Sequence, residues 1–368
     1  MTDNRPTKKK GGLFGVASLV SLSLGALSAI ILLISILSPE FASFFNIYVS
    51  GAVRIALAYI TNFIPFSLAE LMIILSPIAV TLLIVYTVKN KQRRFAKHLI
   101  TLLSAVSIFF SSFVFSFGTG YHTPSLYDRF DISDRSSSVS DLKNAAISLV
   151  GEINRRIPYI SYDSEGSSIM PYSMDKMNEL LVDAYEPISE KYDFVQNFDS
   201  NIKPVLLSRA MAYAHIAGVY TFFTGEANLS VDPPDYSMAF TAAHELAHQR
   251  GIAREDEANF FAFLACLYSK DVYLEYCAYV TMLEHVSSAL YRADPEFHQA
   301  IMSYLSSSAK GEISAYINYF KGVENSVAGK VSASLNNTYL IVNGAEEGKR
   351  SYGLVVDLTV AYFNGLFD

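Results

Sequence analysis

Three uninterrupted apolar runs dominate the first third of the chain. Residues 13–37, 71–88 and 99–118 contain no charged side chain over 25, 18 and 20 positions. A helix needs about 20 such residues to cross the roughly 30 Å hydrocarbon core of a bilayer. The pattern therefore predicts a multi-pass membrane protein whose three transmembrane helices lie within a membrane anchor formed by residues 1–118.

A fourth apolar stretch, residues 46–65, has helical spacing but carries Arg54. Basic side chains cluster at residues 8–10 and 89–97, and the positive-inside rule places both clusters in the cytoplasm. Both placements hold only if an odd number of spans precedes residue 119. Residues 46–65 are therefore expected to form an interfacial or re-entrant helix, with the rest of the chain on the extracytoplasmic side of the cell (cytoplasmic) membrane.

Residues 119–368 have the pattern of a globular domain, in which periodic apolar stretches alternate with segments rich in Gly, Pro and Ser. Helical spacing predicts core-facing helices at 140–157 and 174–192. Two β-prone runs, 218–223 and 228–231, flank a turn and predict a hairpin. The domain is therefore expected to be mainly α, in the α+β class.

Composition supports this division of the chain. The 368 residues are 51% hydrophobic and 17% charged, with a mean hydropathy of +0.26, which is too apolar for an ordinary soluble domain. The formal charge is +7 in residues 1–118 and −14 in residues 119–368. The acidic part has no basic run, so nucleic acid is excluded as a partner. Two cysteines, Cys266 and Cys277, exclude a disulfide scaffold; they either bridge two helices or remain buried thiols.

One motif carries recognisable chemistry. Pro233 and Pro234 break the chain ahead of a helix that is expected to be capped by Asp235 or Ser237. Within that helix, residues 241–251 read TAAHELAHQRG, and Gly251 suits the helix end.

The three polar residues of this motif, His244, Glu245 and His248, form H-E-x-x-H. Residues four apart share one helical face, so two imidazoles reach one metal ion while the carboxylate projects beside them toward a water molecule. The spacing predicts a Zn²⁺ site in which Glu245 is the general base.

Catalytic zinc usually has three protein ligands, so a third must be found. Position 254, where metzincins carry a third His, holds Arg254, which has no lone pair to offer. The remaining donors begin the next predicted helix, residues 255–268. Glu255 starts a stripe of small residues that permits close approach to the His-bearing helix, whereas Glu257 starts a bulky face. Glu255 is the preferred ligand, and Glu257 is the alternative.

Other polar residues have expected roles around this site. Asn259, one turn beyond Glu255, is expected to hydrogen-bond a ligating His. Arg254 is either a solvated residue at the helix start or a charge that orients one of the acids. Glu226 either recognises a substrate amine or is an ordinary turn carboxylate. The group that stabilises the transition state stays open among three residues: Tyr339, Tyr352 and His285.

These residues carry a resemblance to known families. Five positions of the second helix match the E-x-x-A-[DN]-x-F-A pattern of gluzincin metallopeptidases: Glu255, Ala258, Asn259, Phe261 and Ala262. The stretch HELAHQRGIAREDEANFFAFLAC resembles the bacterial domain of unknown function 3810 family, a set of membrane-anchored proteins regarded as zinc peptidases. FFTGEAN, NNTYL and SYGLVVDL extend the resemblance. Gluzincins usually place a longer insert before the Glu helix, whereas His248 and Glu255 are seven residues apart here.

The resemblance implies a zincin/gluzincin-like metallopeptidase domain at residues 119–368 that hydrolyses peptide or protein substrates beside the lipid bilayer. As in other zincins, the hairpin ahead of the motif is the expected edge strand for an extended peptide. The alternative is a catalytically silent zinc-binding sensor or binding protein, although a purely structural metal would not need Glu245. Proteolysis inside the bilayer is disfavoured because Arg250 and Arg254 lie beside the motif.

Overall fold

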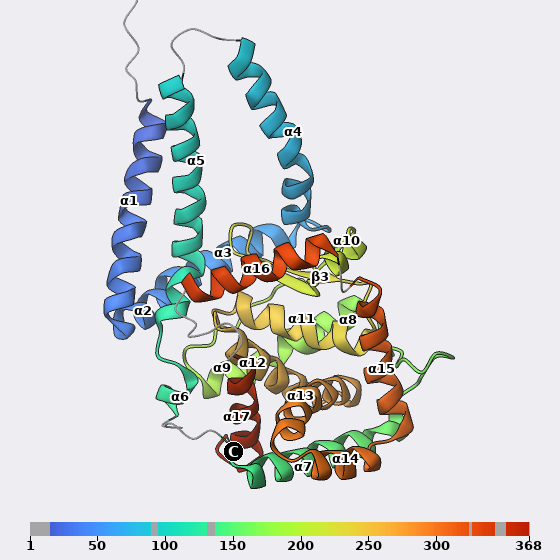
Figure 1. Ribbon diagram of the computed structural model, residues 1–368. Coiled ribbons are helices and arrows are strands. Elements are labelled where there is room, and N and C mark those ends of the chain that lie inside the picture. Colours follow the sequence, from blue (N-terminus) through green and yellow to red (C-terminus); the bar gives the residue numbers. More distant parts are fainter. Residues whose placement is uncertain (1–14, 90–94, 131–136, 324–325, 343–350, 368) are drawn as a thin grey trace, which may run out of the picture.

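A computed structural model describes residues 15–89, 95–130, 137–323, 326–342 and 351–367. Within these residues the fold is mostly helical, with one small sheet (Figure 1). The elements before residue 130 are α1 (Val16–Leu37), α2 (Pro39–Phe44), the π-helix η1 (Phe45–Ser50), α3 (Gly51–Asn62), α4 (Leu68–Lys89), α5 (Phe95–Ser116), the 3₁₀ helix η2 (Gly118–His122) and α6 (Leu126–Arg129).

The later helices form most of the globular part. They are α7 (Val139–Arg156), η3 (Ile157–Tyr159), α8 (Met174–Asp183), α9 (Tyr185–Lys191), α10 (Ser208–Tyr213), α11 (Asp235–Gln249), α12 (Glu255–Tyr268), α13 (Val272–Ala293), α14 (Pro295–Tyr304), α15 (Ser307–Lys321), α16 (Val327–Val342) and α17 (Ser351–Phe363). The strands are β1 (Lys203–Val205), β2 (Gly218–Thr221) and β3 (Glu226–Ser230).

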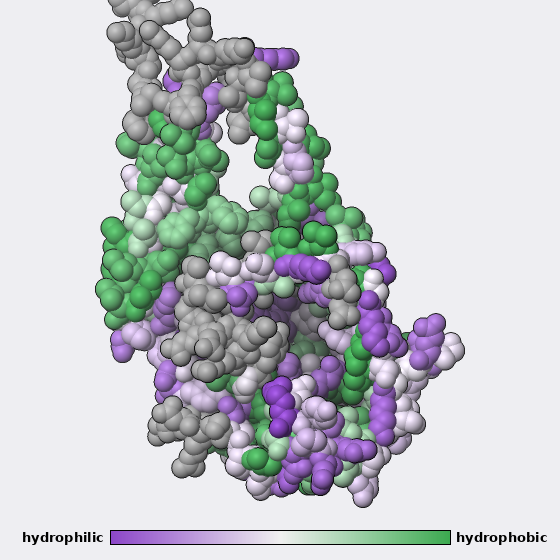
Figure 2. All heavy atoms as spheres, in the orientation of Figure 1, coloured by the Kyte–Doolittle hydropathy of each residue, from purple (hydrophilic) through white to green (hydrophobic). Residues whose placement is uncertain are grey.

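Helices α1, α4 and α5 extend away from the globular part, and α2 and α3 lie across their base (Figure 1). Hydrophobic side chains gather on the extended helices, as Figure 2 shows. Among the described residues, three segments are long and apolar enough to cross a membrane: Val16–Leu37, Pro39–Asn62 and Lys97–Ser116. They indicate a membrane-associated protein.

Two of the three expected spans coincide with helices that are long and apolar enough to cross a membrane. The first and third coincide with membrane-long apolar helices; residues 15, 117 and 118 fall outside those helices, and residues 13 and 14 lie outside the described part of the chain. The expected second span, 71–88, is helical within α4. Among the described residues of α4, the apolar stretch is Leu68–Leu82, which is shorter than a membrane span. Small residues explain why α1 and α5 pack together: Ser28 and Ser35 are fully buried, and a Cβ on Gly25 would lie 2.8 Å from the Ser107 side chain.

Arg54 accounts for the lone charge in residues 46–65. Its side chain is fully buried on α3, where Nη1 donates to the Asn46 amide oxygen at 2.9 Å and to the Ser116 carbonyl at 2.8 Å. Nη2 donates to Gln196 Oε1 at 3.0 Å. A buried guanidinium is tolerated when its donors are satisfied. Arg54 therefore ties the crosswise helix to the end of α5 and to the globular part.

The core of the globular part surrounds α13, which packs against α7, α11, α12 and α17. The expected helix at 140–157 is confirmed as α7, whereas the stretch 174–192 forms two helices, α8 and α9. Cys266 on α12 and Cys277 on α13 are both buried and free. The bridge considered from the sequence is absent, and the two residues are buried thiols.

The sheet has the strand order β1-β3-β2, and β2 pairs antiparallel with β3 in the expected hairpin. Glu226, expected in the turn, is the first residue of β3. Pro234, and neither Asp235 nor Ser237, occupies the N-cap position of α11, so that expectation was wrong by one residue. Among the described residues, β2 has no strand on its other side, which leaves one edge of the hairpin open.

The end of α11 supplies a test of this architecture. Gly251 has φ of +100°, and a Cβ there would lie 2.4 Å from Arg54 Nη2. The substitution Gly251→Ala should lower the free energy of unfolding by about 1–3 kcal/mol because it combines backbone strain with a clash against a buried group. The melting temperature of the full chain in detergent, followed by circular dichroism, measures the loss.

Gly151→Ala is the matched control, because Gly151 lies inside α7 with nothing within 4 Å of an added Cβ. It should leave melting unchanged or raise it slightly, since Ala favours a helix over Gly. Equal melting temperatures for the two variants would contradict the assigned role of the Gly251 turn.

Candidate metal centre

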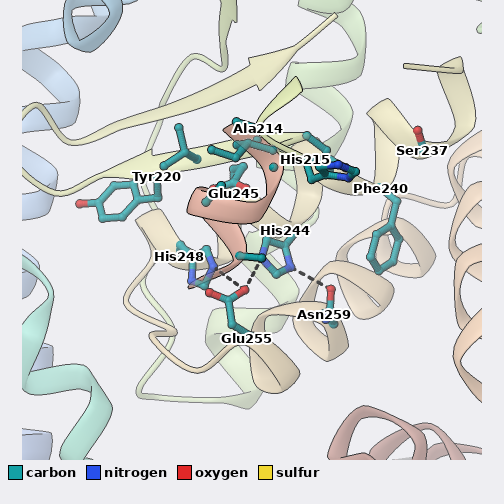
Figure 3. A pocket seen from close by; sticks show the side chains of 18 of the residues that line it. Ala214, His215, Tyr220, Ser237, Phe240, His244, Glu245, His248, Glu255 and Asn259 are labelled. Atoms are coloured by element: carbon teal, nitrogen blue, oxygen red, sulfur yellow. Dashed lines mark hydrogen bonds and ion pairs between the residues drawn. The ribbon is translucent and has the colours of Figure 1, made fainter. Parts of the chain in front are cut away.

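Two helices joined by a short turn bring three ligand side chains together. His244 and His248 project from α11 on one face, and Glu255 projects from the first turn of α12 (Figure 3). Glu255 Oε2 lies 3.2 Å from His244 Nε2 and 3.5 Å from His248 Nε2. One ligand atom from each residue falls within 4.8 Å of the others. The three residues named from the sequence therefore converge on one point.

Each imidazole is fixed through its other nitrogen. His248 Nδ1 lies 2.7 Å from the Ile252 carbonyl, which can only accept, so Nδ1 carries the proton. His244 Nδ1 lies 2.9 Å from Asn259 Oδ1 and donates to it in the same way. The Nε2 atoms then present lone pairs toward Glu255. Asn259 occupies the position expected of it, beside a ligating His.

This arrangement fits a cation. Two Nε2 lone pairs face a carboxylate oxygen, so three hydrogen-bond acceptors point at one another. No donor lies between them unless one of the imidazoles is protonated. Burial opposes a charge on His248, but neighbouring Glu255 outweighs it and raises the pKa of His248 to about 9. A divalent ion would remove this conflict without extra protons. Two imidazoles and one carboxylate are a ligand set that zinc accepts.

Glu245 lies beside the ligands without joining them. Its side chain is buried, Oε2 has no hydrogen-bond partner, and burial raises the pKa of the carboxyl group. Gly218, the first residue of β2, lies directly against it, because a Cβ on Gly218 would be 2.7 Å from both Cγ and Oε1 of Glu245. The Tyr220 backbone bonds this carboxylate, so Oε2 is the oxygen that remains available for proton transfer at the cavity wall.

The centre lies in a cavity of about 1770 Å³. Its walls come from Phe117 and η2, from residues 214–217 and β2, and from α11, α12, α13 and α15, and the first two turns of α16 also line it. His285 on α13 lines the wall, and burial lowers the pKa of this imidazole to about 4, so it is neutral at pH 7. The Tyr339 and Tyr352 side chains lie outside the part of the chain that the structure describes.

Glu257, the alternative ligand, has structural partners. Glu257 is buried, accepts the Leu126 backbone N–H at 2.9 Å and pairs with Arg254 at 3.2 Å. Glu257 lies outside the ligand cluster, so the structure favours Glu255 over this alternative. Arg254 is not a solvated helix start, since it also donates to the Tyr121 and Thr123 carbonyls at 3.0 and 2.6 Å. It orients one acid, Glu257.

Glu226 requires a correction. It does not line the cavity, and its buried carboxylate accepts the backbone N–H groups of Leu68 and Ala69 at 3.0 and 2.9 Å. These groups are unpaired donors at the start of α4, where a carboxylate is favourable. The idea that Glu226 binds a substrate amine was wrong; this residue caps a helix.

Two contributors to the site were missed in the sequence. Gly218 gave a weak signal as a glycine inside a predicted strand, which marks close backbone approach. Phe117 gave no signal, because it ends an apolar run; its ring lies edge-on to His248 with centroids 5.7 Å apart. Both residues come from elements distant from the motif in sequence, so only the fold places them there.

Comparison with known proteins identifies the family. The family model described as "Protein of unknown function (DUF3810)" matches residues 43–360, so the chain belongs to this family. No significant match is found among functionally curated proteins or among solved structures.

The ligand set can be tested with two matched variants. Glu255→Gln and Glu257→Gln each remove one charge from the first turn of α12. Glu255→Gln should weaken zinc binding by at least about 100-fold, beyond the effect typical of residues that only contact a ligand. Glu257→Gln should bind zinc as the native chain does. Calorimetric titration of the purified full chain with zinc measures both, and loss of zinc only in Glu257→Gln would reverse the ligand assignment.

The hydrogen bond behind His244 generates a separate prediction. Asn259→Ala leaves all three ligands but frees the imidazole to rotate, so zinc affinity should fall by about 10–100-fold. The same titration measures it. Unchanged affinity would show that Asn259 does not orient His244.

Proposed function

We propose that this member of the DUF3810 family is a membrane-anchored, zinc-dependent metallopeptidase of gluzincin-like type. The observation that carries the proposal is the convergence of His244, His248 and Glu255 beside the buried carboxylate of Glu245, in a cavity large enough for a peptide. Peptide hydrolysis needs an electrophilic centre and a base side by side. The arrangement of these four residues supplies a place for each.

The proposed roles divide between metal binding by two imidazoles and Glu255 and proton transfer by Glu245. Zinc bound by the two imidazoles and Glu255 would polarise the scissile carbonyl and lower the pKa of a water molecule. Glu245 takes a proton from the attacking water and delivers it to the leaving amine, so one water is consumed and a carboxylate and an amine are released. The burial of Glu245, which raises the pKa of its carboxyl group, suits a residue that accepts and then returns a proton.

The open edge of β2 is the proposed binding edge for an extended peptide. It begins at Gly218 beside Glu245, and Val219 and Tyr220 also line the cavity. Main-chain pairing with an edge strand binds peptides without demanding one sequence. His285, which is neutral and lines the cavity from α13, is the proposed donor to the oxygen that gains charge during the reaction.

The proposed location is the cell membrane, with the site outside the cytoplasm. Lys89 ends α4, Lys97 lies near the start of α5, and both mark the ends of these helices that are farthest from the globular part (Figure 1). By the positive-inside rule this end faces the cytoplasm. We take α1, α4 and α5 as the spans, and the crosswise residues 39–62 as lying at the outer interface.

Glu245→Gln tests the proposed function. The variant keeps the shape of the side chain but removes the base, so kcat should fall by about 10²–10⁴-fold while zinc binding is retained. The measurement is turnover of a randomised peptide library by the full chain in detergent, with cut sites read by mass spectrometry. Activity of the native chain should also disappear on chelation and return with zinc. Equal turnover by both proteins would contradict the peptidase assignment.

Gly218→Ala tests the edge strand. The added methyl group would overlap the Glu245 side chain and the Thr241 methyl group at 2.7 Å, so it would push β2 away from the base. Displacement of reacting groups by about 1 Å costs on the order of 10²-fold in rate. Gly151→Ala is again the control and should cleave the library at the native rate. An unimpaired Gly218→Ala variant would argue against peptide binding at β2.

A further inference from the structure

The hairpin β2–β3 connects the metal centre to the apolar helices. β2 begins over Glu245 and ends at Thr221, where Phe222 and Phe223 follow. The Phe222 ring lies 5.0 Å from that of Phe109 on α5, and the Phe223 ring lies 5.7 Å from it. Phe109 is seven residues, or about 10 Å, before the end of this helix. The strand therefore leads from the catalytic carboxylate to the flank of an apolar helix.

The tip of the hairpin contacts three helices, α3, α4 and α5. The Ser116 hydroxyl on α5 donates to the Phe222 carbonyl at 2.9 Å. Gly225 lies against Leu57 of α3, where an added Cβ would be 2.5 Å from the Leu57 Cβ. Glu226 caps α4, as described above. Three apolar helices thus fix the direction of β2, and this direction is a property of the fold.

The level of the bilayer surface is marked by aromatic side chains. Exposed aromatic residues occur on α2, η1, α3 and the loop that follows α3: Phe44, Tyr48, Tyr59, Phe63 and Phe66. Tyr48 and Tyr59 are of the type found in the belts where membrane proteins meet lipid headgroups. η2 contacts α2 and η1, and Tyr121 of η2 lines the cavity beside Phe117. One wall of the cavity is therefore built from residues that lie where α5 leaves the apolar layer.

Resting on the peptidase function proposed above, we propose that the substrates are membrane-anchored polypeptides, cut in the extended segment that emerges beside their own anchor. Such a segment pairs with β2, its membrane-proximal end toward Phe222 and its scissile bond beside Glu245. Phe222 is four positions beyond Gly218 along the extended chain, or about 13 Å. Cleavage is therefore expected within roughly 5–10 residues of the bilayer, a spacing that follows from the same rise per residue.

A spacer series tests this substrate class. The full chain is reconstituted with zinc into liposomes together with reporters that carry a randomised eight-residue segment. In three reporters the segment is joined to a single transmembrane anchor by spacers of about 3, 15 or 40 residues, which reach increasing heights above the bilayer. A fourth reporter is the free peptide. The 40-residue reporter is concentrated in the membrane to the same extent as the 3-residue reporter, because both have the same anchor. A difference between their cleavage rates therefore reports only the distance from the bilayer.

The shortest spacer should be cut at least tenfold faster than the 40-residue spacer. In a Glu245→Gln chain that carries a photo-crosslinking residue in place of Val219, the short-spacer reporter should also be captured in preference to the other three. Rates and capture independent of spacer length would overturn the substrate class and leave the peptidase function standing. Cleavage of no reporter, with native and Glu245→Gln chains alike, would count against the peptidase function itself.

Discussion

The candidate metal centre depends on the turn at residues 250–254, which folds α12 back against α11 so that a carboxylate meets two imidazoles. Gly251 makes this possible, because its φ of +100° is a conformation that other residues adopt only with strain. The turn also contacts one of the candidate ligands directly, because the Ile252 carbonyl accepts a hydrogen bond from His248 and fixes the orientation of its ring. A longer connection could place the same acid there, but it would leave this imidazole without its acceptor.

The turn is itself held by residues that precede position 119. Asn46 donates a hydrogen bond to the Gly251 carbonyl at 3.0 Å. Arg54 donates a hydrogen bond to Asn46 and packs against Gly251. Phe117 packs edge-on against His248 from the segment that follows α5. The N-terminal part of the chain therefore contributes contacts that support the geometry of the candidate ligands. A fragment that begins after residue 118 would lose Asn46, Arg54 and Phe117 together.

Local signals predicted much of this structure from the sequence. The helix at 255–268 has the expected bounds, and the H-E-x-x-H spacing with the small-residue face of α12 identified the cluster before any coordinates. Long-range contacts could not be predicted in this way. Arg54 was recognised as unusual only because it is charged, and its partners Ser116 and Gln196 are 62 and 142 residues away. Nothing local showed that Glu226 caps α4 instead of facing the cavity, because its partners precede it by 157 and 158 residues.

The proposed function requires that His244, His248 and Glu255 hold one zinc ion. Zinc K-edge X-ray absorption of the purified full chain measures the ligands of that ion. We expect one zinc per chain, bound only by nitrogen and oxygen at about 2.0–2.2 Å and with two imidazole contributions. Absence of stoichiometric zinc, a sulfur contribution near about 2.3 Å, or a shell without imidazole would contradict it.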